Sequence, residues 1–232
     1  ESPLLRIRAA RLACTAAEYF RDRGRHVLLT MDSVTRFAHA QRLIGLSVGE
    51  PPATKGYTPS VFANMALLLE RAGVLADSAG GGSITGLYTV LVEGDDMSEP
   101  VADAARGILD GHVILSRRLA QRAHYPAIDI LDSVSRVADE ITPRELGAAR
   151  RQIVRMLAAY REVEELVQIG AYARGSSPDS DTALDYWRPI NDLLRQARDE
   201  TEPHEASLRR FLKLATDSAQ ALSTAGRPRA RS

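Results

Sequence analysis

The sequence predicts an α/β part followed by a small all-helical C-terminal part. Short apolar runs alternate with helical periodicity up to about residue 136, which is typical of a parallel sheet covered by helices. After Thr142-Pro143 no strand candidate remains, and three long amphipathic patterns follow. With 232 residues, of which 44% are hydrophobic and 26% charged, the chain has enough apolar material for a real core.

The elements of the α/β part can be placed one by one. Gly24 follows the first helix as a C-cap, and Asp32 closes the first strand. Thr58-Pro59 supplies an N-cap and a proline at the first helical position. We expect, in order, helix 4–23, strand 27–31, helix 33–46, loop 45–59, helix 59–72, connection 79–82, strand 83–92, strand 113–115, helix 116–123 and strand 127–130.

The helical part should contain three helices, over 143–169, 179–198 and 204–222, separated by turns rich in Gly, Ser, Pro and Asp. These patterns divide the chain into three regions. The expected regions are 1–141 for the α/β core, 142–222 for the helical domain and 223–232 for a disordered tail.

Charge and composition limit the function classes. The formal net charge is zero, so no global field favours nucleic acid or an anionic membrane. No apolar run reaches the roughly 18 residues of a membrane span, and no signal peptide is visible. The single cysteine, Cys14, excludes an internal disulfide. We therefore expect a cytoplasmic protein, and the opening Glu-Ser-Pro, without Met, suggests a fragment.

Asp32 is the first residue that points to chemistry. An acid at the carboxyl end of a buried parallel strand lies where α/β sheets bind ligands, and in nucleotide hydrolases it holds a Mg²⁺-bound water. The alternative is a helix N-cap, since Asp-Ser often precedes a helix.

A phosphate-binding loop of the form Gly-x-x-x-x-Gly-Lys-Ser/Thr is absent from the sequence. The only lysines, Lys55 and Lys213, lie in other contexts, and Gly80-Gly81-Gly82 has no lysine after it. Two interpretations stay open: the protein is not such an ATPase, or the loop lies before residue 1.

A longer motif resembles the ten-residue signature of the rotary ATPase α/β family, Pro-[Ser/Ala/Pro]-[Leu/Ile/Val]-[Asp/Asn/His]-x-x-x-Ser-x-Ser. It is Pro126-Ala-Ile-Asp-Ile-Leu-Asp-Ser-Val-Ser135. Other blocks of the family are matched in order, and some of them resemble its flagellum-specific and type III secretion ATPase branch. These blocks are 17–22 with 27–32, 49–57, 82–85, 89–96, 107–112, 170–176 and 189–191.

The resemblance covers about residues 2–215 and implies a partial RecA-like parallel sheet with flanking helices, then a small all-helical domain. It implies Mg²⁺-dependent ATP hydrolysis at the subunit interfaces of a homohexamer, energising type III protein export. The segment 93–97 leans towards the flagellar system. Since the phosphate loop and the family's general-base glutamate are absent, the chain itself should be inactive.

Three side chains carry the implied chemistry. By resemblance, Asp32 is the Mg²⁺-water ligand, Arg36 lies near the γ-phosphate, and Arg136 is the arginine finger that reaches the neighbouring subunit's site. Such a finger neutralises transition-state charge and is worth roughly 10³–10⁵ in rate. The structural alternative for Arg36 is an exposed helix charge.

Further residues have weaker assignments. Tyr125 matches the family's adenine-stacking aromatic, although an aromatic before a strand is often a core residue. Asp95 and Asp96 belong to an interface loop near the nucleotide or only shape a turn. His112 and His124 lack metal-ligand spacing and are expected to be structural.

The resemblance also implies partners: a cytoplasmic regulator, a central stalk protein, chaperone–substrate complexes and the membrane export gate. No nucleic acid is expected. Two alternatives remain: a subunit of a rotary ATP synthase, and a truncated non-catalytic module that binds partners through its C-terminal helices.

Overall fold

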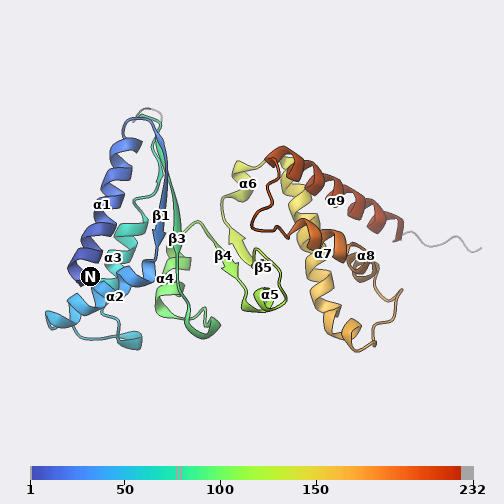
Figure 1. The fold of residues 1–232 in the computed structure, drawn as a ribbon, viewed down its shortest axis with the longest axis horizontal. Helices are drawn as coiled ribbons and strands as arrows, with labels where there is room; N and C mark the ends of the chain where they lie inside the picture. The colour runs from blue at the N-terminus through green and yellow to red at the C-terminus, as the bar shows by residue number, and fades with distance from the viewer. Residues whose placement is uncertain (1, 77, 79, 226–232) are drawn as a thin grey trace, which may run out of the picture. The chain divides into compact units, whose positions relative to one another are not determined.

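A computed structural model describes residues 2–76, 78 and 80–225. The chain forms two compact units, residues 1–110 and residues 111–232. The first holds a small sheet with helices, and the second holds a strand pair followed by long helices (Figure 1). The expected α/β part followed by a helical region is confirmed.

The sheet of the first unit is built on one long parallel pair. β1 (His26–Asp32) lies beside β3 (Ser83–Thr89) along its whole length. The short β2 (Gly73–Val74) pairs antiparallel with β3, so the strand order is β1-β3-β2. The two strands expected around 27–31 and 83–92 are therefore present, side by side and parallel.

The helices cover one face of this sheet. They are α1 (Pro3–Arg21), α2 (Val34–Ser47), α3 (Pro59–Leu69) and α4 (Pro100–Ile108). Leu29 and Met31 of β1 pack against the core that these helices enclose, in which Val61 and Met65 are fully buried. Leu28, between them in sequence, is 64% exposed, because successive side chains of a strand point to opposite faces.

Helix α4 was not among the expected elements, although its start follows ordinary capping rules. The Glu99 carboxylate accepts hydrogen bonds from the Val101 and Ala102 amides, at 3.1 and 3.2 Å. Pro100 then occupies the first helical position, where its missing amide costs nothing. Two short 3₁₀ turns, η1 (Thr54–Gly56) and η3 (Glu93–Asp95), lie in the loops of this unit.

The second unit corrects the expectation that strands 113–115 and 127–130 belong to the parallel sheet. β4 (Gly111–Leu115) and β5 (Ile128–Ser135) pair with each other, and they are antiparallel. The helix between them, α5 (Arg117–Gln121), has five residues and is about 7.5 Å long. It is too short to return the chain along a strand, as a parallel crossover requires.

The helical region contains α6 (Ala138–Ile141), α7 (Arg144–Gln168), α8 (Pro178–Leu193) and α9 (His204–Ala225). Its core joins the three long helices, with Met156 and Ile190 about 1% exposed. Helix α8 ends five residues before the expected position, and α9 runs through residues 223–225. The rest of the expected tail, 226–232, lies outside the described residues. None of the described helices is long and apolar enough to span a membrane.

Replacing the fully buried Met65 with alanine should lower the free energy of unfolding by about 2–5 kcal/mol, because it leaves a cavity in the core under the sheet. Leu67→Ala on the same helix is the matched control, since Leu67 is 68% exposed and should change stability by less than about 0.5 kcal/mol. Urea unfolding followed by circular dichroism measures both. Equal losses would contradict the assignment of the core.

Candidate functional site

Asp32 lies at the carboxyl end of the parallel pair. It is the last residue of β1 and stands opposite Thr89, the last residue of β3. Its side chain is exposed, whereas Ser33 and Val34 directly after it are buried. The carboxylate is therefore presented at the sheet edge where α/β folds bind their ligands.

The helix that follows is capped by Ser33 and not by Asp32. The Ser33 hydroxyl accepts a hydrogen bond from the Arg36 amide at 3.3 Å. This excludes the N-cap interpretation of Asp32. Arg36 lies in the first turn of α2 and is exposed, so Asp32 and Arg36 bring one negative and one positive group to the same strand–helix junction.

Thr35 ties this junction to the loop after β3. Its Oγ1 accepts a hydrogen bond from the Leu91 amide at 2.8 Å, and it lies 3.4 Å from the Leu91 carbonyl, to which it donates. Thr35 is 7% exposed, so the contact is shielded from water. The clamp holds the start of the 90–99 loop beside the first turn of α2.

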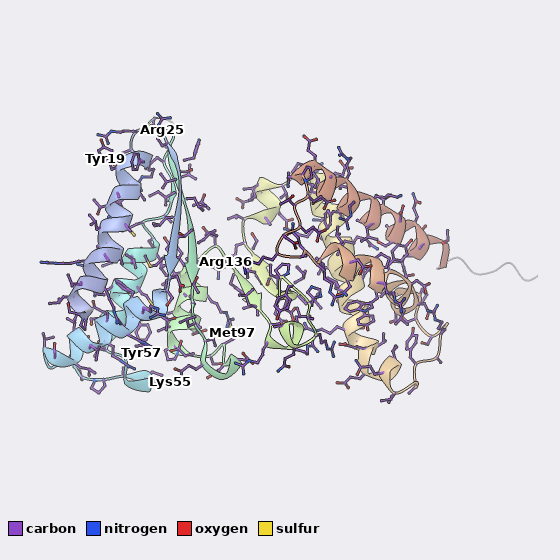
Figure 2. The ribbon with its side chains drawn as sticks, viewed as in Figure 1. Tyr19, Arg25, Lys55, Tyr57, Met97 and Arg136 are labelled. Carbon is purple, nitrogen blue, oxygen red and sulfur yellow. The ribbon has the colours of Figure 1, made fainter. Side chains whose placement is uncertain are left out.

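A second contact holds the later part of the 90–99 loop. Asp96 accepts a hydrogen bond from Lys55 Nζ at 3.0 Å, which lowers the pKa of the Asp96 carboxyl, and it also accepts from the Ser98 amide at 3.0 Å. Figure 2 labels Lys55 near Tyr57 and Met97 in this part of the first unit. Asp96 thus joins two loops, which agrees with a role in shaping the turn. Asp95 precedes it in a left-handed conformation, with φ 60°.

Tyr57 lies two residues after Lys55, in the same loop. It is 3% exposed, and burial together with the negative charge of Glu99 raises its pKa to about 12. Its hydroxyl lies 3.1 Å from His39 Nε2. The loop carrying Lys55 is therefore anchored to α2 by a neutral, buried phenol.

In the second unit, the signature residues serve the backbone of the strand pair. Asp129 Oδ1 accepts hydrogen bonds from the Leu131 and Asp132 amides. The Ser133 hydroxyl donates to the Asp129 carbonyl at 2.5 Å and accepts from the Ile114 amide at 2.9 Å, where the register between β4 and β5 shifts. The motif fixes an irregular strand rather than forming a catalytic cluster itself.

Arg136 directly follows β5 and is exposed (Figure 2). Tyr125, before the strand, is 56% exposed, so it is not a core residue. Its hydroxyl donates to the Ala120 carbonyl at 3.3 Å, and its own carbonyl accepts from the Gln196 amide at 2.9 Å. The two residues expected to contact nucleotide thus flank the same strand.

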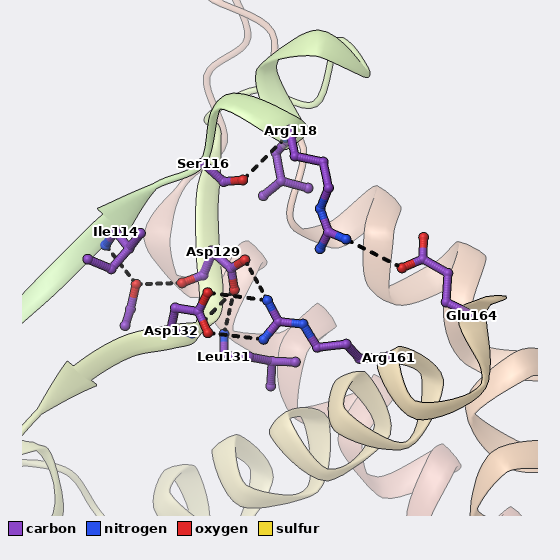
Figure 3. Close-up of polar contacts among 10 residues, drawn as sticks. Ile114, Ser116, Arg118, Asp129, Leu131, Asp132, Arg161 and Glu164 are labelled. Atoms are coloured by element: carbon purple, nitrogen blue, oxygen red, sulfur yellow. Dashed lines mark hydrogen bonds and ion pairs between the residues drawn. The ribbon is translucent and has the colours of Figure 1, made fainter. Parts of the chain in front are cut away.

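Arg161 of helix α7 forms ion pairs with two carboxylates of this strand, a contact called here the Arg161 fork (Figure 3). Arg161 donates to Asp129 at 3.1 Å and to Asp132 at 3.0 Å, and the hydrogen bond lowers the pKa of Asp132. One turn further along α7, Glu164 pairs with Arg122 at 2.8 Å. Sequence reasoning missed Thr35, Lys55 and Arg161, because their partners lie 56, 41 and 29–32 residues away, respectively.

No group of three or more His, Cys, Asp or Glu side chains able to hold a metal occurs among residues 2–76, 78 and 80–225. His112 contacts the Asp132 carbonyl at 3.1 Å and His124 is buried, consistent with structural roles. A lone exposed carboxylate such as Asp32 suits Mg²⁺, which keeps several waters and otherwise binds substrate phosphates.

The structure gathers the expected residues in two groups, one in each unit. Asp32, Arg36, Asp95 and Asp96 lie at the junctions after β1 and β3, whereas the nucleotide-facing candidates of the second unit flank β5. Residues 1–135 match the model of the ATP synthase alpha/beta family, nucleotide-binding domain. The chain belongs to this family. Residues 142–213 match a second model, the type III secretion system EscN ATPase C-terminal domain.

Relatives with curated names agree with both models. The chain is 50% identical over 214 residues to a flagellum-specific ATP synthase of Pseudomonas aeruginosa, covering 92% of the chain and 47% of that protein. It is 53% identical over 207 residues to one from Salmonella typhimurium, covering 89% and 45%. A type 3 secretion system ATPase of Xanthomonas euvesicatoria is 50% identical over 216 residues, covering 93% and 48%. The chain therefore spans about half the length of these relatives.

Solved structures show the same fold. The assembled ATPase EscN of the enteropathogenic E. coli type III secretion system matches with a TM-score of 0.86 and 43% identity, over 92% of this chain and 51% of that one. EscN in complex with its central stalk EscO matches at 0.83 and 42%, over 92% and 50%. An ATP synthase subunit, NeqB of Nanoarchaeum equitans, matches at 0.81 with 26% identity, over 98% and 55%.

Thr35→Val should destabilise the chain by about 1–3 kcal/mol, because the Leu91 amide loses its acceptor while the volume stays nearly constant. Amide hydrogen exchange at Leu91 should become faster. Thr30→Val, at an exposed position of β1, is the matched control and should have little effect. Unchanged exchange at Leu91 in the Thr35 variant would show that the clamp does not hold the loop.

Asp132→Asn should cost about 1 kcal/mol at pH 7, a small value because the carboxylate is half-exposed and screened by water. The folded pKa of Asp132 lies below its ordinary value, so its contribution is present above about pH 4 and is lost as the pH falls through the folded pKa. The wild-type and variant stabilities should therefore converge in acid. Urea unfolding at pH 7 and in acid measures both stabilities, and Asp199→Asn, at an exposed turn, is the control and should change the stability at pH 7 by less than about 0.5 kcal/mol.

Proposed function

We propose that the chain belongs to an ATPase that energises type III protein export, in the flagellar system. The observation that carries this proposal is Asp32, which lies at the carboxyl edge of a parallel strand pair within a segment that matches a nucleotide-binding domain. The second match, over residues 142–213, is to the C-terminal domain of a secretion ATPase and favours export over ATP synthesis.

In this proposal each residue has one task. Asp32 holds a water of the Mg²⁺ that accompanies ATP, and Arg36 neutralises charge near the γ-phosphate. Tyr125 offers its exposed ring to the adenine. Arg136 comes from the neighbouring copy in a homohexamer and stabilises the charge that develops in phosphoryl transfer. Asp95 and Asp96 shape the loop beside this interface.

The domain division proposed from the sequence is kept for a RecA-like core over 1–141 and a helical domain from 142, but the proposed tail over 223–232 loses residues 223–225, which belong to α9. The two family matches, over 1–135 and 142–213, support a boundary before residue 142. The compact units divide earlier, between Asp110 and Gly111, because β4 pairs with β5 and β5 contacts α7.

Proposed partners follow from the export assignment. They are a central stalk protein, a cytoplasmic regulator, chaperone–substrate complexes and the membrane export gate, with the ATPase in the cytoplasm at the membrane periphery. The similar protein EscN was solved in complex with its central stalk EscO, which supports the first of these. A chain without the Gly-x-x-x-x-Gly-Lys-Ser/Thr motif should bind ATP weakly and not hydrolyse it, so residues 1–232 alone should be inactive.

The two alternatives are open to simple tests. An in-frame phosphate-loop motif upstream of codon 1 supports the enzyme and contradicts a truncated binding module. Co-purification with a membrane proton channel would favour a rotary ATP synthase subunit, and co-purification with export components favours the proposal.

The proposed arrangement is tested in the full-length protein. Arg136→Ala should lower kcat by about 10³-fold or more, because the transition state loses its positive charge. Asp32→Asn should also abolish hydrolysis. Arg174→Ala, an exposed arginine paired with Asp185 in the helical region, is the control and should retain activity.

A mixture of the two inactive proteins decides whether the site is shared. When Arg136→Ala and Asp32→Asn subunits are assembled together, some interfaces combine an intact Asp32 with an intact Arg136 from the adjacent copy. Hydrolysis should therefore reappear in the mixture. If both residues served the same subunit's site, every site would lack one of them, and the mixture would stay inactive.

A further inference from the structure

The strand that leads to Arg136 is held to α7 by charged contacts as well as by the packing of Ile130 and Leu131. A cavity of about 70 Å³ lies against it, lined in part by Ile128, Ile130 and Leu157. Side chains beside a cavity lose contacts on that side, so apolar packing fixes the strand less firmly there. The Asp129 and Asp132 carboxylates, which face Arg161, add a polar link between β5 and α7 beside this cavity.

In the Arg161 fork, the two terminal nitrogens of the guanidinium bind two different carboxylates. Arg161 Nη2 donates to Asp129 Oδ2, while its Nη1 donates to Asp132 Oδ1, at 3.1 and 3.0 Å (Figure 3). The planar guanidinium fixes both distances together, which a lysine cannot do. Asp129 is in turn locked to the backbone by the Leu131 and Asp132 amides. The fork thus fixes the orientation of the strand and not only its distance from the helix.

A second pair of contacts holds the segment that precedes β5. Glu164 lies three residues after Arg161 on α7 and pairs with Arg122, just after α5, at 2.8 Å. The Gln196 amide, after α8, donates to the Tyr125 carbonyl. The helical region therefore holds the segment before β5, next to Tyr125, as well as Asp129 and Asp132 within the strand that leads to Arg136.

We propose that Arg161 is a positioning residue for Arg136. It does not touch the nucleotide; it sets the orientation of the strand end four residues after Asp132, from which the Arg136 side chain extends. This inference rests on the proposed role of Arg136 as the arginine finger. Through Arg161, the helical domain determines how well the finger is placed, and a misplaced catalytic group loses rate rather than substrate affinity.

The test is a double-mutant cycle in the full-length protein, with Arg161→Leu, Arg136→Ala and the combined variant. Arg161→Leu should lower kcat by about 10- to 100-fold, with KM for ATP changed by less than about threefold. The combined variant should be no slower than Arg136→Ala within about twofold, because a residue that acts only through Arg136 has nothing left to position. Arg161→Lys should restore part of the rate, since it keeps one arm of the fork.

Arg155→Leu is the matched control, because Arg155 is also on α7 but pairs with Asp179 of α8 at 2.7 Å. It should leave kcat near that of the wild type. In the 232-residue chain, amide exchange over 130–136 should become faster in Arg161→Leu and stay unchanged in Arg155→Leu. If Arg161→Leu does not assemble, Asp132→Asn removes the charge of one arm and should lower kcat in the same direction by a smaller factor.

The outcomes separate the two proposals. Unchanged hydrolysis in Arg136→Ala would overturn both. A large loss in Arg136→Ala with an unchanged kcat in Arg161→Leu overturns the positioning role alone. The positioning role is also overturned if the losses in the combined variant multiply, or if exchange over 130–136 does not change.

Discussion

The parallel register of β1 and β3 is the constraint on which the candidate site depends. Because the strands are paired from His26–Ser83 to Asp32–Thr89 without a shift, both end at the same level. The chain leaves the sheet at adjacent points, and the helix α2 and the 90–99 loop start side by side. A single side chain, that of Thr35, therefore joins the helix to the loop through its hydrogen bond with Leu91. A slip of one residue would turn Asp32 to the covered face, because the side-chain period of a strand is two.

The charged contacts of the two units act differently. In the first unit, Lys55 and Asp96 are about half-exposed, so their ion pair orders loops without adding much stability. In the second, Asp129 is 9% exposed and hydrogen-bonded to its own backbone before Arg161 reaches it. A buried carboxylate with fixed partners specifies geometry, since any other arrangement would leave a charge unpaired. The backbone geometry is thus fixed more firmly around Asp129, in the strand that leads to Arg136, than in the loops of the first unit.

Much of the fold could be predicted from local sequence. The apolar run ending at Asp32, the Thr58-Pro59 start and the long amphipathic helices follow rules that act within a few residues, and they were confirmed. The pairing of β4 with β5 was predicted wrongly, because apolar character alone does not distinguish a parallel strand from half of an antiparallel pair. The roles of Thr35 and Arg161 arise from long-range contacts that no local pattern encodes. The assignments of Asp32, Arg36, Tyr125, Asp95, Asp96 and Arg136 remain predictions.

The stacked pair in the helical core gives the protein an intrinsic optical reporter. Trp187 is the only tryptophan in the sequence, and its ring lies parallel to Tyr160 with a centroid separation of 3.7 Å. Tyr160 is adjacent in sequence to Arg161. Indole emission depends strongly on the local environment, so a movement of α7 against α8 changes the fluorescence of one identified side chain. Events in the helical region can thus be followed without attaching a dye.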